Sequence, residues 1–385
     1  MPAATPVRRY LDNAATSWPK PPEVLAAWEA AARSLGAAAG RGTYREAVVA
    51  DGIRSRCRTA VARLLGGVDP DRVAFPASAT LGLNMAIHGV VAAGDHVIAT
   101  AADHNATLRP LHWLASRGVI TLSIVPCDGA GHVDPDDVVR AWRPATRMVA
   151  CSHASNVTGV VQDMAAIAAC SRDRGGILLV DAAQSLGLLP CPVADIVVAP
   201  AHKWLLGPAG AGILWVRPGI EPLPIVQGGT GSASDSLTMP ERFCDRMEAG
   251  TPDLPALAGL LAAVERIEAG VPGSVAGHCG GLAAAAAARL ASRPGVRVIG
   301  PSRAASGGGR AAPIVSFTVE GYDPAEVAVL VEQIAGVQVR AGFHCAAAIH
   351  AHLGTATGGT VRASFGPANT ADDVGALAEA VEQLV

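Results

Sequence analysis

Short apolar runs rich in β-branched residues alternate with segments of helical spacing from about residue 72 to residue 216. These runs predict seven strands: Arg72–Phe75, His96–Thr100, Ile120–Pro126, Arg147–Ser152, Ile177–Asp181, Asp195–Ala199 and Gly212–Val216. Helices are predicted over Pro22–Leu35, Tyr44–Leu65, Leu81–Val91, Ala106–Arg117, Asp134–Trp142 and Met164–Arg174. Such alternation is typical of a wound, mostly parallel α/β sheet that is covered by helices.

The pattern changes after residue 216. A glycine-rich loop over Gly228–Asp235 is followed by an alanine-rich helix from Pro252 to about Ala269. The remaining chain predicts, in order, a helix over Gly281–Ser292, strands at Val296–Ile299 and Ala312–Val319, a helix over Pro324–Ile334, a strand at Val337–Ala341, and a last strand and helix. This mixture indicates a smaller α+β domain. Gly307–Arg310 predicts a turn, because no strand-to-helix context marks it as a phosphate loop.

Composition narrows the class of protein. The chain has 385 residues and a formal net charge of −3, which argues against nucleic acid or a membrane surface as a partner. No apolar run reaches the ~18 residues of a membrane span, and the first residues lack the apolar segment of a signal peptide. The eight cysteines form no CxxC pair, so we expect reduced thiols in the cytoplasm and no metal site.

Two predicted neighbouring strands end in chemically useful side chains. Asp181 ends one strand, and His202-Lys203 follow the next. Parallel strands present such residues at their carboxyl ends, where open α/β sheets bind ligands. An acid that pairs with a ring nitrogen and a lysine that forms an imine are what pyridoxal 5'-phosphate requires of a protein. Together, in this order, the two motifs predict a pyridoxal phosphate site.

Three other positions are ambiguous when taken singly. His104 follows a predicted strand and could stack on a flat ring, although an ordinary loop histidine is the favoured interpretation of this residue alone. Asn156 also follows a strand and could donate to a phenolate oxygen. Thr80 lies at a helix start, where it could bind phosphate or serve as a plain helix cap.

These motifs, in this order, resemble the cysteine desulfurase and selenocysteine lyase branch of the fold-type I pyridoxal phosphate enzymes, within the class V aminotransferase group. The resemblance spans essentially the whole chain. It is carried by Tyr10–Thr16, Asp103-His-Asn105, Ser155–Gly159, Asp181–Gln184, His202-Lys203, Gly228–Gly231, Glu248–Pro252, Arg340–Ala346 and Thr360–Ser364. It implies a large pyridoxal phosphate-binding domain over 17–255 with a mostly parallel seven-stranded sheet. Residues 1–16 and 256–385 would form the small domain that carries the Cys345 loop.

The resemblance also implies roles for individual residues. Lys203 would be the Schiff-base lysine, and Asp181 the partner of the pyridinium nitrogen. Further cofactor contacts would come from His104 over the ring, Asn156 and Gln184 at the ring oxygen, and Ala79, Thr80 and His202 at the phosphate. Thr230 would reach the phosphate of a neighbouring subunit, which implies a homodimer. Arg362 would bind the substrate carboxylate, and Asn13 and Arg340 are further candidates for substrate contacts.

Cys345 decides the expected reaction. It lies in a predicted loop near His344 and His350, which is the setting of a reactive thiol, whereas most lone cysteines are small buried hydrophobic residues. With the motif Arg340-x-Gly-x-His-Cys345-Ala, the resemblance implies attack by the Cys345 thiolate on the sulfur of L-cysteine. The products would be alanine and a persulfide for transfer to an acceptor, which is expected to be a separate protein.

Other functions stay open at this point. The chain could be a pyridoxal phosphate-dependent C–S lyase or a selenocysteine lyase, and more remotely a non-catalytic scaffold for sulfur transfer. An aminotransferase is disfavoured because it leaves the loop cysteine unexplained. Pro200 and Ala201 precede His202-Lys203, where the family often has a hydroxyl residue and glycine, so we expect phosphate binding to be weaker or differently distributed.

Overall fold

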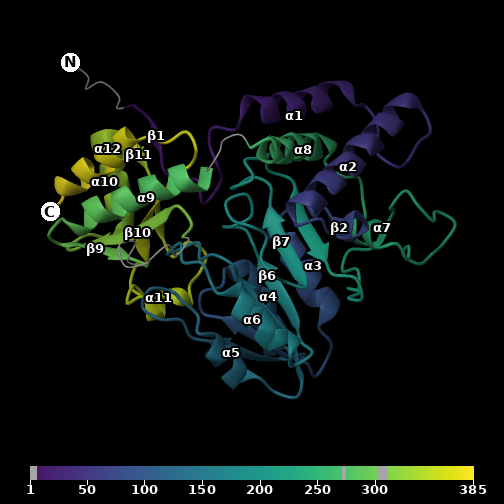
Figure 1. Cartoon of the computed structure of the whole chain (residues 1–385), viewed down its shortest axis with the longest axis horizontal. Helices are drawn as coiled ribbons and strands as arrows, with labels where there is room; N and C mark the ends of the chain where they lie inside the picture. Colours follow the sequence, from purple (N-terminus) through teal and green to yellow (C-terminus); the bar gives the residue numbers. More distant parts are fainter. Residues whose placement is uncertain (1–6, 271–274, 302–310) are drawn as a thin grey trace.

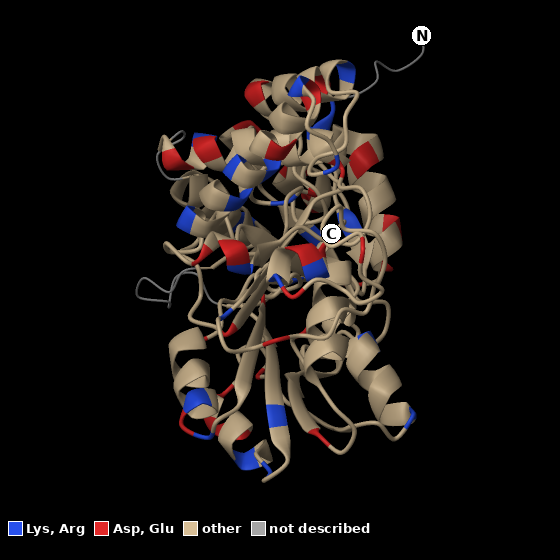
Figure 2. Ribbon diagram, turned by 90° about the vertical axis from the view of Figure 1, so that its right-hand side faces the viewer, with Lys and Arg blue, Asp and Glu red and all other residues tan. Residues whose placement is uncertain are grey.

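The structure is a computed structural model that describes residues 7–270, 275–301 and 311–385. The expected turn at Gly307–Arg310 lies outside the described residues. Within the described ranges, no helix combines the length and apolarity that crossing a membrane requires. On the face seen in Figure 2, Lys and Arg are interspersed with Asp and Glu.

The larger part of the molecule is built on a seven-stranded sheet with strand order β2-β8-β7-β6-β5-β3-β4. Its strands are β2 (Val73–Ala74), β3 (His96–Thr100), β4 (Thr121–Val125), β5 (Thr146–Ser152), β6 (Ile177–Asp181), β7 (Ile196–Pro200) and β8 (Gly212–Val216). Five neighbouring strands, from β7 to β4, run parallel, and β8 is antiparallel to both of its neighbours. The expected mostly parallel sheet of seven strands is therefore confirmed, each strand within one or two residues of its predicted position.

Helices cover this sheet (Figure 1). They are α1 (Pro22–Ser34), α2 (Arg45–Leu64), α3 (Ala79–Val90), α4 (Asn105–Ser116), α5 (Pro135–Ala141), α6 (Met164–Arg172), α7 (Phe243–Met247) and α8 (Leu254–Glu268). Because the central strands are buried on both faces, the apolar side chains of β6 and of β7 each alternate between two hydrophobic clusters, one of which the two strands share. Ile196 and Val198 face α3, whereas Val197 and Ala199 face α2 and α8.

The smaller part contains an antiparallel four-stranded sheet, ordered β12-β13-β10-β9, and a two-stranded parallel sheet of β1 and β11. The strands are β1 (Arg9–Tyr10), β9 (Val296–Ile299), β10 (Ile314–Val319), β11 (Val337–Gln338), β12 (Arg340–Gly342) and β13 (Thr360–Ser364). The helices are α9 (Val275–Ala291), α10 (Pro324–Ala335), α11 (Ile349–His352) and α12 (Ala371–Glu382). The single strand expected over Val337–Ala341 is thus divided between two sheets.

Helix α8 shows where the two parts meet. Leu257, Leu260 and Leu261 pack in the same cluster as β7 and β8, and Figure 1 shows α8 beside α1 and α2. The sequence predicts a domain boundary at residues 255/256. We propose instead that α8 belongs to the large domain and that the small domain follows Glu268, with β1 joined to it through β11.

Candidate active site

The carboxyl ends of β5, β6 and β7 lie next to one another in the sheet, and their polar residues meet in a recess of about 90 Å³. Eight residues expected from the sequence line it: Ala79, Thr80, His104, Asn156, Asp181, Gln184, His202 and Lys203. Pro200 also lines the recess, so the atypical proline borders the site itself. Parallel strand ends therefore converge on one binding region, as the strand pattern predicts.

Lys203 and Asp181 form the ionisable pair of this recess. Burial lowers the pKa of Lys203 to about 8, and the nearby Asp181 carboxylate opposes that shift. Burial raises the pKa of Asp181, while Lys203 acts in the opposite direction. Within the described residues the Lys203 amine has no hydrogen-bond partner, whereas the backbone N–H of Ala183 donates to Asp181 Oδ1 across 2.9 Å. The amine is therefore available to a ligand and can lose its proton near neutral pH.

His104 is both a helix cap and a wall of the recess. It occupies the N-cap of α4, where its Nδ1 accepts a hydrogen bond from the backbone N–H of Ala106 at 3.0 Å. Burial, followed by the positive charges of Lys203 and Arg340, lowers the pKa of His104 to about 4. The ring is consequently neutral, and because Nδ1 accepts, Nε2 carries the proton.

Asp103, the residue before this cap, is anchored by buried hydrogen bonds. Its carboxylate accepts hydrogen bonds from the backbone N–H of Thr100 (2.7 Å), the Thr100 hydroxyl (3.0 Å) and the backbone N–H of Ser152 (2.5 Å). These bonds tie the end of β3 to the end of β5. Burial raises the pKa of Asp103 to about 6, with the hydrogen bonds opposing the change. The position of His104 therefore rests on a buried carboxylate.

The helix start at Thr80 is capped by another residue. Ser78 is the N-cap of α3, and its hydroxyl accepts from the backbone N–H of Leu81 at 3.1 Å. Thr80 is therefore not the N-cap of α3, which was one of the two interpretations of this residue from the sequence. It is one of the residues that line the recess.

Gln184 and Asn156 each use part of their amide for the protein itself. Gln184 Nε2 donates to the Ala14 carbonyl at 3.0 Å, and its Oε1 accepts from the Trp204 indole N–H at 2.7 Å. Asn156 Nδ2 donates to the His344 carbonyl at 2.6 Å. Each amide nitrogen has two N–H groups, so one remains for a ligand in the recess.

The Cys345 loop reaches the same region from the small domain. Among the eight cysteines, all of which are described, Cys345 is the exposed one. An N–H of the Arg340 guanidinium donates to its Sγ at 3.4 Å, and the backbone N–H of Asn105 donates to its carbonyl at 2.7 Å. His344 and Cys345 have φ angles of 50° and 58°. Such backbone costs about 1–3 kcal/mol per residue and persists only where surrounding contacts hold it.

The two histidines near Cys345 support the loop. His344 Nε2 lies 2.9 Å from Thr360 Oγ1, and His350 Nδ1 lies 2.8 Å from Thr355 Oγ1. Burial lowers the pKa of both histidines, so both rings are neutral at pH 7. The sequence leads us to expect these histidines beside a reactive thiol. Within the described residues, however, their hydrogen bonds go to the loop and to Thr360, and the side chain that contacts Sγ is Arg340.

Arg362 projects from β13 and is almost completely buried. Its Nη2 donates to Asp12 Oδ1 at 2.8 Å and its Nη1 to the Asn156 carbonyl at 3.0 Å, while Nε has no partner among the described residues. Asp12 is a site-adjacent residue that sequence reasoning missed. Asp12 belongs to the Tyr10–Thr16 motif, and its place in that motif is the feature of the sequence that could have identified it.

Asn13 and Thr230 lie apart from the recess. Asn13 is fully buried, and its amide binds the Ser364 carbonyl at 3.0 Å and Asn369 Oδ1 at 3.1 Å. This geometry gives no support to a substrate contact, and we propose that Asn13 joins the amino-terminal segment to the small domain. Thr230 lines a separate cavity of about 540 Å³ together with Arg41.

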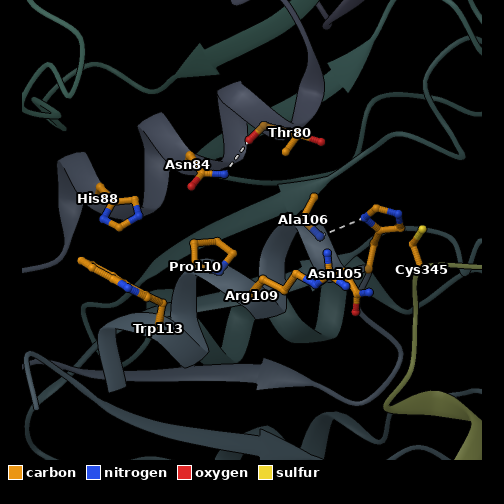
Figure 3. Close-up of a pocket in the computed structure, with 10 residues that line it drawn as sticks. Thr80, Asn84, His88, Asn105, Ala106, Arg109, Pro110, Trp113 and Cys345 are labelled. Atoms are coloured by element: carbon orange, nitrogen blue, oxygen red, sulfur yellow. Dashed lines mark hydrogen bonds between the residues drawn. The ribbon is translucent and has the colours of Figure 1, made fainter. Parts of the chain in front are cut away.

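A second cavity, of about 570 Å³, adjoins the recess and shares Thr80, His104 and Ala106 with it. Figure 3 shows that side chains of α3 and α4 line it, with His88 and Trp113 at one end and Cys345 at the other. Asn105 belongs to the Asp103-His-Asn105 motif, whereas sequence reasoning missed Asn84, His88, Arg109, Pro110 and Trp113. Their helical spacing of three or four residues is a signal of a shared face, but only packing shows that the two faces meet.

Comparisons with known proteins agree with this architecture. The model of the aminotransferase class-V family matches residues 9–377. A protein of Methanothermobacter thermautotrophicus named probable cysteine desulfurase is 32% identical, with 97% of this chain and 94% of that protein covered. One of the same name from Pseudomonas aeruginosa is 34% identical, covering 95% and 90%. The apo structure of cysteine desulfurase from Thermococcus onnurineus NA1 superposes with a TM-score of 0.88 at 30% identity, covering 98% of this chain and 94% of that one. The chain therefore belongs to the aminotransferase class-V family and groups within it with proteins named cysteine desulfurase.

Proposed function

We propose that this protein is a pyridoxal phosphate-dependent cysteine desulfurase, which converts L-cysteine into L-alanine and keeps the sulfur as a persulfide on Cys345. The observation that carries the proposal is the position of the exposed Cys345 thiol. It shares a cavity with His104, and His104 also lines the recess of Lys203 and Asp181. The recess of Lys203 and the cavity of the Cys345 thiol therefore adjoin at His104, which supports a shared role for the lysine and the thiol.

The residues of the recess fit pyridoxal phosphate. Lys203 offers an amine without a protein partner, Asp181 offers a buried carboxylate, and Asn156 and Gln184 each retain an N–H. The first turn of α3, which contains Thr80, supplies backbone N–H groups for a phosphate. When bound, the cofactor supplies an electron sink for bonds broken at the substrate's carbon atoms.

Four residues of the chain would then have separate roles in the reaction. The pKa of about 8 leaves a fraction of Lys203 neutral at pH 7, which suits it to take the α-proton of cysteine at Nζ. The carboxylate of Asp181 would hold the pyridine nitrogen protonated. The neutral His104 ring would cover the cofactor face, and its Nε2–H is free to donate. Arg362, whose positive charge acts on both Lys203 and His104, would bind the substrate carboxylate.

Cys345 would perform the sulfur chemistry. Its thiolate attacks the substrate sulfur, a bond forms between the two sulfur atoms, and the bond from substrate Cβ to sulfur breaks. The bonding electron pair stays with Cβ, which gains a proton to give alanine. Cys345 is left as a persulfide, so no outside oxidant is required. Arg340, 3.4 Å from Sγ, would counter the negative charge at this position.

The assembly and partners are also part of the proposal. Thr230 lies in a different cavity from Lys203, which supports a role for it at a neighbouring subunit's phosphate and hence a homodimer. A sulfur acceptor must approach Cys345, and because this thiol is exposed on the cavity, the approach is open to a small thiol as well as to the acceptor protein expected from the sequence. The eight free cysteines support a reducing cytoplasm as the location.

The first test is alanine release from L-cysteine, with pyridoxal phosphate and a reductant, for wild type beside Cys345→Ala. Cys170→Ala is the matched control, because Cys170 is half-buried on α6, away from both cavities. We expect alanine from the wild type and the control and almost none from Cys345→Ala, which should still take up the cofactor. Equal turnover by all three proteins would overturn the persulfide mechanism and favour a C–S lyase.

A further inference from the structure

The 570 Å³ cavity in front of Cys345 has an uneven distribution of charge. Arg109 is the one charged side chain that lines it, and no described carboxylate does. Arg109 is exposed, and among the described residues it has neither a hydrogen bond nor an ion pair. Some exposed arginines of this chain, such as Arg33 and Arg63, are paired with glutamates, whereas Arg109 has the cavity in front of it. An unpaired guanidinium in a cavity is suited to bind an anionic group of a ligand.

The remaining walls suit a small organic molecule. Ala106, Pro110 and Trp113 supply apolar surface, while Asn84 and Asn105 add a few polar groups. Trp113 is 56% exposed, and its ring packs edge-on against His88 with the centroids 5.9 Å apart. Burial lowers the pKa of His88, so this end of the cavity adds no second cation at neutral pH. A mostly apolar cavity of this volume with few polar groups is typical of small-ligand sites.

Arg109 and Cys345 line the same cavity. Asn105, whose backbone N–H binds the Cys345 carbonyl, precedes Arg109 by one helical turn, a rise of ~5.4–6 Å. A small molecule that places an anion at Arg109 can therefore remain in the cavity that also contains Cys345. The positive charges of Arg109 and Arg340 both reach His104, which lies between the recess and the cavity.

We propose that this cavity binds the sulfur acceptor and that its ligand is a small thiol bearing a carboxylate, which Arg109 holds. This inference rests on the proposed persulfide chemistry. The acceptor thiolate attacks the outer sulfur of the Cys345 persulfide, and a new sulfur–sulfur bond forms on the acceptor. The bond from Cys345 Sγ to that sulfur breaks, and its electron pair returns Cys345 to the thiolate. The acceptor leaves as a persulfide, and the sulfur count is unchanged.

The test uses holoenzyme whose Cys345 persulfide has been formed with one equivalent of L-cysteine, and compares two acceptors, 3-mercaptopropionate and its neutral amide, 3-mercaptopropionamide. The readout is the ratio of the second-order rate constants for sulfur transfer to the two acceptors, with acceptor persulfide trapped by alkylation and measured by mass spectrometry. We expect the wild type to prefer the carboxylate about fivefold, the strength of a partly exposed charge pair. Arg109→Gln should bring the ratio to about one, and Arg109→Glu should reverse the preference.

Arg117→Gln is the matched control, because Arg117 is an exposed arginine just after the same helix and does not line the cavity. It should keep the wild-type ratio, which separates local binding from a change in net charge. Equal ratios in the wild type and Arg109→Gln would overturn the proposal. So would an Arg109 effect confined to the KM for cysteine, or persulfide transfer to a protein cysteine alone. Absence of alanine with every thiol, dithiothreitol included, would instead refute the proposed function.

Discussion

The side-chain amide of Asn156 donates a hydrogen bond of 2.6 Å to the backbone carbonyl of His344. Asn156 follows β5 of the large sheet, and His344 precedes Cys345 in the small domain. Both groups are buried, so the bond joins the larger and the smaller part of the molecule between the Lys203 recess and the Cys345 loop. It also helps to hold a loop in which two successive residues have positive φ.

Replacing Asn156 by Asp should loosen this junction. The carboxylate has nearly the same shape but cannot donate, so the His344 carbonyl is left buried without its partner. We expect the free energy of unfolding to fall by about 1–3 kcal/mol. Chemical denaturation measures this loss, and alanine release should fall with it. Asn105→Asp serves as the control for stability, because Asn105 begins α4, where an acidic residue is tolerated. A variant with wild-type stability would show that the bond contributes nothing.

The role of His104 as a helix cap and the role of its ring can be tested separately. Asparagine is a good N-cap, so His104→Asn should keep the bond to the Ala106 N–H, whereas His104→Ala loses it. We expect the alanine variant to be less stable than the asparagine variant by about 0.5–2 kcal/mol. Both lack the ring, so both should shift the absorbance of bound cofactor by a similar amount. Equal stability of the two variants would contradict the capping role.

The lowered pKa of Lys203 predicts that the rate of cofactor attachment depends on pH. Its pKa is lowered to about 8, so the unprotonated amine increases as the pH rises toward 8 and decreases below it. The rate at which the apo protein attaches pyridoxal phosphate should therefore rise with pH and level off above about pH 8. Stopped-flow absorbance gives the rate, and borohydride trapping with mass spectrometry identifies the lysine. Lys203→Arg should show no attachment, and a midpoint near pH 10 would mean that burial does not act on this amine.

Arg362 and Asp12 should be energetically coupled. Arg362→Lys keeps the charge, but a lysine cannot bind both Asp12 and the Asn156 carbonyl in the guanidinium geometry. We expect the KM for cysteine to rise more than kcat falls. A double-mutant cycle with Asp12→Asn should give a coupling energy of about 1–3 kcal/mol in unfolding, since one partner is buried and the other is mostly so. Additive effects would show that the pair is not coupled.

The sequence was sufficient to predict the sheet and the residues at its carboxyl edge. The strand pattern is local, because apolar runs of four to eight residues separated by helical segments permit few other arrangements. Parallel strands bring their ends to one edge, so the positions of Asp181 and Lys203 follow from chain order. The seven-stranded sheet and the shared recess confirm this reasoning.

Elsewhere, distant partners decided the outcome. The segment Val337–Ala341, in which apolar and polar residues alternate, predicts one strand, but β11 pairs with β1 from the amino-terminal segment, and β12 pairs with β13. No pattern within the segment shows that its two halves join different sheets. Helix α8 likewise follows the domain boundary expected from the sequence, yet it packs on the large sheet because its leucines meet β7 and β8 there.

The chemistry at Cys345 shows the same division. By itself the sequence determined which side chains are available, including a cysteine near two histidines and two arginines, and the order of motifs indicated the family. Only the tertiary structure placed Arg340 against the sulfur, directed His344 and His350 into the loop, and opened a cavity between α3 and α4. The physical reason is that local spacing governs secondary structure, whereas the direction of each side chain depends on contacts with segments far away in the chain.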